Sequence, residues 1–163
     1  MLPTRSRLAF TLGLLALLAG CQNFAAIAPG TSSSELVKQF GAPNVVGKNS
    51  DGSEVWEYPR MPSGYEKFLI EIGADRTVRS VHQVLAEEYL SKVRIGMSRD
   101  DVRQILGTPY EIATFNRRNE EVWTWPYRDT PAVVLFHVHF DRSSGAVTQV
   151  LRFDDLDNAM LGD

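Results

Sequence analysis

The chain has 163 residues, of which 44% are hydrophobic, a formal net charge of −3 and a single cysteine. The negative charge argues against the basic surface that nucleic-acid-binding proteins need. With one cysteine, no disulfide can form within the chain, so an apolar core must stabilise the fold. The length allows one compact domain or two small lobes that share a core.

The first 20 residues have the pattern of a secretory signal peptide. Arg5 and Arg7 precede an apolar run from Leu8 to Leu18, and two small residues follow it. A helix that crosses the hydrocarbon core needs roughly 20 residues, so this run is too short for a permanent transmembrane anchor. Removing the segment takes away both arginines and lowers the formal net charge of the remainder from −3 to −5.

The only cysteine, Cys21, follows directly, in the sequence Leu-Ala-Gly-Cys. This sequence resembles the lipobox of bacterial lipoproteins, in which the thiol receives a diacylglycerol and the new amino terminus is acylated. The resemblance implies lipidation of Cys21, and several acyl chains make membrane attachment effectively permanent. Gln22 follows, rather than the Asp that retains lipoproteins in the inner membrane, so the implied location is the outer membrane, facing the periplasm. The alternative is a chance cysteine behind an ordinary signal peptide.

The remaining chain is a tandem duplication. GTSSSELVKQFGAP at 30–43 is echoed by GMSRDDVRQILGTP at 96–109, and EVWEYP at 54–59 by EVWTWP at 121–126. A repeat of this period indicates two copies of one structural unit. We therefore divide the chain into a first unit at 21–83, a second unit at 84–153 and an acidic tail at 154–163.

Each unit begins with helical segments. Ser32 and Ser98 are good helix N-caps, with an acidic residue three positions later, and Gly41 and Gly107 are suited to end the two helices. Residues 84–93 have helical composition and predict a further helix that leads the second unit. Its counterpart in the first unit would be the shorter stretch 23–27.

Three strands are predicted after the capped helix of each unit, separated by turn sequences. They lie at 54–59, 68–72 and 78–81 in the first unit and at 121–127, 133–140 and 147–153 in the second. Three-stranded sheets are marginal alone. We therefore predict an α+β fold, in which two helix-strand-strand-strand units form a continuous antiparallel sheet of about six strands. Its helices would cover one face and leave the other open to a partner.

Aromatic residues alternate along the first predicted strand of each unit. Either they line the open face as binding anchors or they pack beneath the helices. We expect Trp56 and Trp123 in the core, because large aromatic side chains are mostly buried. Tyr58, Trp125 and Tyr127 lie nearer the strand ends, so we expect them to be partly exposed and take them as candidate partner-binding residues.

His137 and His139 share one face of a predicted strand, and such a pair can offer two imidazoles to a metal. The opposite face carries Phe136, Val138 and Phe140, which form the natural core side. With no third ligand nearby, we expect two polar residues on a solvated face, and no metal or cofactor. No motif carries a catalytic mechanism, so we do not expect an enzyme.

The pattern at Gly96 to Pro109, with Trp123-x-Trp125 and a strand ending in Phe140-Asp141, resembles the SmpA/OmlA (BamE-like) family of outer-membrane lipoproteins. The resemblance implies a periplasm-facing lipoprotein that assists the machine inserting β-barrel proteins. Family members usually carry one unit. The two-unit form is similar to the β-lactamase inhibitor protein architecture, which implies a concave protein-binding surface.

The expected function is therefore a non-enzymatic scaffold in outer-membrane protein assembly or envelope integrity. Its expected partners are membrane lipid and an envelope protein such as the β-barrel assembly complex. The alternative is an inhibitor-like binder of a periplasmic or secreted enzyme.

Overall fold

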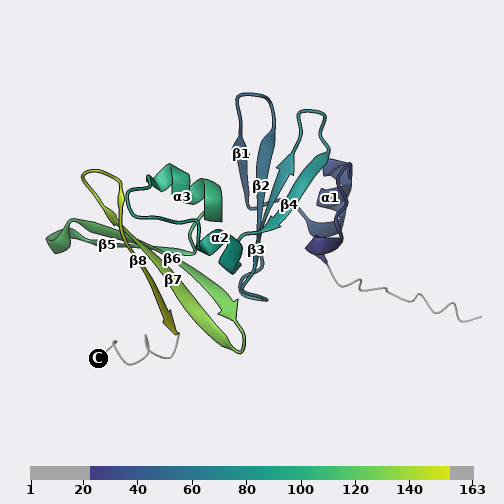
Figure 1. Cartoon of the computed structure of the whole chain (residues 1–163). Helices are drawn as coiled ribbons and strands as arrows, with labels where there is room; N and C mark the ends of the chain where they lie inside the picture. Colours follow the sequence, from purple (N-terminus) through teal and green to yellow (C-terminus); the bar gives the residue numbers. More distant parts are fainter. Residues whose placement is uncertain (1–22, 155–163) are drawn as a thin grey trace, which may run out of the picture.

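The computed structural model describes residues 23–154, which fold into two separate four-stranded antiparallel sheets with short helices (Figure 1). This confirms the predicted α+β class. The predicted signal peptide, Cys21 and most of the predicted acidic tail lie outside the described residues. Both sheets are simple meanders, with strand orders β1-β2-β3-β4 and β5-β6-β7-β8.

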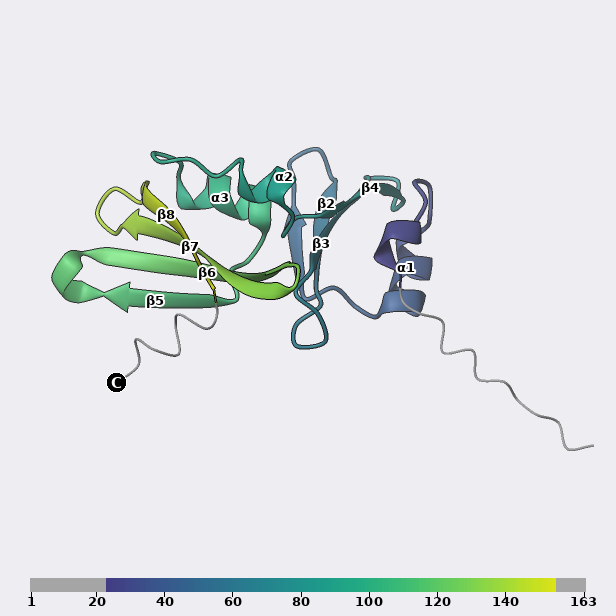
Figure 2. The ribbon, with the colours of Figure 1, turned by 60° about the horizontal axis from the view of Figure 1, so that its bottom comes forward.

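The same element order occurs twice along the chain. The first unit contains η1 (Phe24–Ala26), α1 (Ser33–Phe40), β1 (Val45–Lys48), β2 (Glu54–Pro59), β3 (Lys67–Ile72) and β4 (Val78–Gln83). The second contains α2 (Glu87–Leu90), α3 (Arg99–Leu106), β5 (Glu111–Phe115), η2 (Asn116–Arg118), β6 (Glu120–Asp129), β7 (Ala132–Asp141) and β8 (Val147–Asp154). Helix α1 covers one face of the first sheet, whereas α2 and α3 lie on the second sheet and face the first sheet from its other side (Figure 2).

The prediction of one continuous six-stranded sheet is wrong. Each unit carries an additional first strand, β1 or β5, and keeps its own sheet and its own apolar cluster. All four residues of β1 are exposed, and four of the five residues of β5 are exposed. Neither strand therefore shows the alternation of apolar and polar residues by which a half-buried strand is recognised.

The predicted caps of the two main helices are present. Ser98 Oγ accepts a hydrogen bond from the Asp101 amide at 3.2 Å, and the Asp101 carboxylate accepts one from the Ser98 amide at 2.9 Å. In α1, Ser32 Oγ accepts from the Glu35 amide at 3.2 Å. Hydrogen bonds from Ser98 also hold the pKa of Asp101 below its usual value. The two helices thus start where the sequence predicts.

The predicted leading helices are shorter than expected. Only Glu87–Leu90 of the stretch 84–93 is helical, and Ala86 at its start provides no capping side chain. The segment is held mainly by burial of Leu85, Leu90 and Val93 in the second core. In the first unit the counterpart is a single 3₁₀ turn, η1. None of the helices within 23–154 is both long and apolar enough to cross a bilayer.

Both EVW motifs place a carboxylate on the indole of a buried tryptophan. Trp56 and Trp123 are 4% and 2% exposed, which confirms their predicted core positions. Trp56 Nε1 donates to Glu54 Oε2 at 2.7 Å, and Trp123 Nε1 donates to Glu121 Oε1 at 2.8 Å. In each unit an arginine, Arg76 or Arg99, pairs with that carboxylate at 2.8 Å. The motif therefore satisfies the polar atom of a large core residue.

The expectation that Tyr58, Trp125 and Tyr127 are partly exposed is wrong, since they are only 4%, 0% and 5% exposed. Tyr58 lies two residues after Trp56, and Trp125 and Tyr127 lie two and four residues after Trp123. Strand periodicity therefore places them on the same faces as the two tryptophans, under the helices. Tyr58 Oη also donates to the Gly41 carbonyl at 3.0 Å, and burial raises the pKa of Tyr58 to about 12. Tyr58 therefore belongs to the first apolar core, and Trp125 and Tyr127 belong to the second.

Candidate functional site

The two units meet where the end of α3 reaches the first sheet. Glu57 lies on β2 between the core residues Trp56 and Tyr58. Because successive side chains of a strand point to opposite faces, Glu57 points away from α1 and toward the second unit. Its carboxylate accepts from the Thr108 amide at 2.9 and 3.1 Å and from Thr108 Oγ1 at 3.2 Å. The buried carboxylate thus accepts hydrogen bonds from both the amide and the hydroxyl of Thr108, in the turn that follows α3.

Lys67 on β3 completes this junction. Its ammonium lies 3.7 Å from Glu57 Oε2 and donates to the Thr108 carbonyl. Glu57 and Lys67 are 7% and 6% exposed. Burial lowers the pKa of Lys67, and the neighbouring Glu57 offsets part of that effect. Charged side chains are rarely buried without a partner, so Glu57, Lys67 and Thr108 depend on one another for their burial.

Gly107 permits the close approach of the two units. Its backbone has φ +70 and ψ −167, a region that is essentially restricted to glycine. A Cβ atom at this position would lie 2.9 Å from Glu57 Oε2 and 3.1 Å from Leu69 Cδ2. Gly41, the equivalent residue after α1, also has positive φ, but a Cβ there would meet no atom within 4 Å.

Three adjoining hollows follow the junction of the two units. The first, of about 650 Å³, lies between the open face of the first sheet and α3, which contributes Asp100, Arg103 and Gln104. The second, of about 390 Å³, shares Val45 and Glu57 with the first. The third, of about 310 Å³, lies on the second sheet and shares Met61, Tyr110 and Pro126 with the second. Because neighbouring hollows share walls, we treat them together as the junction groove.

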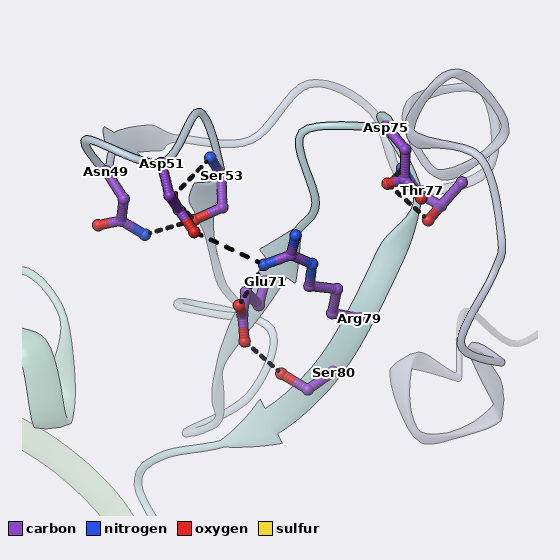
Figure 3. Close-up of polar contacts among 8 residues, drawn as sticks. All are labelled: Asn49, Asp51, Ser53, Glu71, Asp75, Thr77, Arg79 and Ser80. Atoms are coloured by element: carbon purple, nitrogen blue, oxygen red, sulfur yellow. Dashed lines mark hydrogen bonds and ion pairs between the residues drawn. The ribbon is translucent and has the colours of Figure 1, made fainter.

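The first hollow has an apolar floor, including Val55 and Leu69, and a charged rim. Glu71 lines this hollow, and beside it Arg79 lies between two carboxylates, with Nη1 3.4 Å from Glu71 Oε1 and 3.8 Å from Asp51 Oδ2 (Figure 3). Ser80 Oγ donates to Glu71 Oε2 at 3.4 Å. An apolar floor with a polar rim is the composition of protein-binding surfaces.

The β1–β2 turn holds the rim of this hollow in place. Ser53 donates to Asp51 Oδ1 through both its amide, at 2.9 Å, and its hydroxyl, at 2.6 Å, and Asn49 Nδ2 donates to Ser53 Oγ at 2.9 Å (Figure 3). These hydrogen bonds from Ser53 lower the pKa of Asp51. The turn therefore presents a fixed carboxylate to Arg79.

His137 and His139 lie on the face opposite Phe136, Val138 and Phe140, as predicted, and His137 lines the third hollow. His139 Nδ1 is 2.7 Å from Glu120 Oε1, whereas His137 Nδ1 is 3.0 Å from the hydroxyl of a buried threonine. Within residues 23–154, no three His, Cys, Asp or Glu side chains are grouped so that they could hold a metal ion. The two imidazoles thus have separate hydrogen-bond partners.

Residues 83–149 match the family model described as "Outer membrane protein assembly factor BamE domain". This part of the chain is similar to BamE domains. The match spans α2, α3 and β5 to β7 and confirms the predicted resemblance for the second unit. The first unit repeats the same capped helix and EVW strand outside the matched residues.

Three solved structures are similar to the chain. One, assigned as the osmotically inducible lipoprotein OsmE, is 26% identical with a TM-score of 0.38, over 48% of this chain and 92% of that one. A Streptococcus mutans protein assigned as a β-lactamase inhibitor protein is 15% identical with a TM-score of 0.28, over 80% and 87%. A DUF4309 family protein (YjgB) from Bacillus subtilis is 13% identical with a TM-score of 0.29, over 76% and 78%. No curated protein gives a significant match.

Sequence reasoning missed Glu57, Lys67 and Thr108, which lie at the centre of the junction groove. The duplication contains the signal that identifies two of them. Thr108 replaces the Ala42 of the first copy, and Glu57 aligns with Thr124 of the second. At both of these positions the two copies differ in polarity, and both residues lie at the contact between the units.

The paired glycines provide a test of the junction. Gly107→Ala and Gly41→Ala both place a side chain in a glycine-only conformation, which costs about 1–3 kcal/mol. Gly107→Ala also pushes against Glu57 and Leu69, so it should lower the free energy of unfolding by about 1–3 kcal/mol more than Gly41→Ala. Urea denaturation of both variants measures the difference, and equal losses would contradict the described contact.

His137 should make stability depend on pH. Burial, followed by the charge of His139, lowers the pKa of His137 from 6.5, so the unfolded chain binds this proton more readily than the folded chain. Its contribution to stability is present above pH 6.5 and is lost as pH falls through the lowered pKa. Urea midpoints between about pH 7 and 5 should fall less steeply in His137→Gln than in the wild type. His82→Gln is the matched control, and an unchanged slope in His137→Gln would refute this assignment.

Proposed function

We propose that this protein is a lipid-anchored lipoprotein of the outer membrane that binds envelope proteins through the junction groove. It serves as a non-enzymatic accessory factor in outer-membrane protein assembly or envelope integrity. The observation that carries this proposal is the match of residues 83–149 to the BamE domain of an outer-membrane protein assembly factor. The Leu-Ala-Gly-Cys sequence ending at Cys21 supports the lipid anchor.

An anchor at Cys21 would hold the first unit close to the membrane. Phe24 lies three residues later, is 4% exposed and packs between Phe40, Tyr58 and Phe68. Because three residues extend roughly 10 Å at most, a lipid at Cys21 would have only a short tether to the first unit. The first unit would therefore lie next to the bilayer, with the second unit further along the chain.

The junction groove is the surface best suited to a protein partner. Its walls come from both units, and it combines an apolar floor with charged residues at the rim. Val45 borders two of its hollows and is 38% exposed. The buried ion pair between Glu57 and Lys67 beneath the groove fixes the positions of its walls. Less conformational entropy is therefore lost when a partner binds.

Crosslinking in cells tests this proposal. A photoreactive amino acid replaces Val45 in the groove or, as a matched control, Val37 on the outside of α1, which is 37% exposed. We expect an adduct with an envelope protein from position 45 and none from position 37, identified by mass spectrometry. No adduct at 45, or equal adducts at both positions, would overturn the groove assignment.

The identity of the crosslinked protein distinguishes the two candidate functions, and membrane fractionation tests the lipid anchor. A component of the β-barrel assembly complex at position 45 supports an assembly role, whereas a periplasmic or secreted enzyme favours an inhibitor-like function. Cys21→Ser should move the protein from the membrane to the soluble fraction, with Gln22→Ala as the control that keeps the cysteine. Retention of Cys21→Ser in the membrane fraction would remove the lipid anchor from the account.

A further inference from the structure

Strand β5 is a free edge of the second sheet and has an unusually apolar border. In the order β5-β6-β7-β8 it has only β6 as a neighbour. Ile112 and Phe115 on this strand are 51% and 41% exposed, and Tyr110 just before it is 63% exposed. An edge strand directs unpaired N–H and C=O groups outward and is therefore a template for another strand.

The other strand edges carry protective features that β5 lacks. The pairings of β4 and β8 with their neighbours contain register shifts, at Glu71/Ile72 and His139/Phe140. Strand β1 is only four residues long and ends in Gly47-Lys48. Strand β5, in contrast, pairs with β6 in unbroken register over all five residues and contains no lysine or proline. It is the edge least protected against pairing.

The charges at the two ends of β5 make the strand complementary to itself. Glu111 begins the strand, and Arg117 and Arg118 follow its other end in η2. Arg118 Nε pairs with Glu120 at 3.0 Å, whereas the Arg117 side chain has no hydrogen bond or ion pair within the described residues. An antiparallel copy of the same strand would place the acidic end of each strand beside the basic end of the other. When Ala113 lies opposite itself, Glu111 is opposite Phe115 of the other copy and one diagonal step from Arg117, a spacing that long side chains can bridge.

We propose that β5 pairs antiparallel with β5 of a second copy of this chain, which joins two second sheets into one continuous sheet. With the two-fold axis at Ala113, the middle residue of β5, the two Ile112 side chains lie near the centre of the seam. The helices α2 and α3 of both copies remain on the same face of the joined sheet. Although Tyr110 and Glu111 also line the third hollow, the pairing is formed by the free backbone edge of β5, so its test at position 113 can fail independently of the crosslinking test at position 45.

Disulfide trapping tests the pairing on the full chain, purified in detergent and treated with a mild oxidant. Directly opposite residues of antiparallel strands have Cβ atoms about 4.5–5.5 Å apart, so Ala113→Cys should crosslink with a small adjustment. Val46→Cys, on the exposed edge strand β1, is the matched control. Both variants retain Cys21, so any dimer formed through that residue would be the same in each. We expect a dimer from Ala113→Cys and little from Val46→Cys on non-reducing gels. Equal or absent dimers would overturn the proposal.

Charge exchange distinguishes this register from a nonspecific contact. In the Ala113→Cys background, Glu111→Arg or Arg117→Glu alone should reduce the dimer fraction several-fold, and the two together should restore it, because the exchanged edge is again self-complementary. Failure of the double variant to recover dimer, while its circular dichroism remains unchanged, would overturn the proposal. A crosslink from position 113 to a different protein would likewise exclude a second copy as the occupant.

Discussion

A single buried carboxylate, that of Glu57, determines how the two units are joined. It lies on a strand face that would otherwise be open, and it is matched by Lys67 and by the amide and hydroxyl of Thr108. Removing one partner of a buried ion pair typically costs about 3–5 kcal/mol, because the other charge remains without compensation. The end of α3 is thereby fixed against the first sheet. The junction groove owes its shape to this contact.

Duplication explains the fold, whereas divergence between the copies explains the junction. The shared residues are helix caps, a glycine after each helix and a tryptophan with its carboxylate acceptor, which each unit needs for itself. The junction residues have no such duplicate. Strand register places Leu135 of the second sheet where the first has Lys67, since each pairs with the equivalent proline. The first sheet therefore has charges at the positions where it receives the second unit.

The sequence alone predicts the helices and strands that local chemistry determines. Ser98 and Asp101 predict a helix start because each side chain satisfies the other's amide, and the alternation of Trp123 with its neighbours predicts a strand. It was not sufficient for β5, whose residues are exposed on both faces. Glu57 was also missed, because a charged residue in a strand has the same pattern whether water or another unit covers it. Trp125 is buried because strand periodicity, and not its place near the strand end, determines which face it occupies.

Amide hydrogen exchange, compared between the wild type and Glu57→Ala, tests most directly whether this carboxylate holds the two units together. In the wild type the Thr108 amide should be protected, and β3 and β7 should exchange with similar free energies, since the units open together. In Glu57→Ala, which removes the acceptor, the Thr108 amide should lose its protection and the two strands should exchange with different free energies. Unchanged protection of Thr108, with β3 and β7 still exchanging alike, would contradict the account.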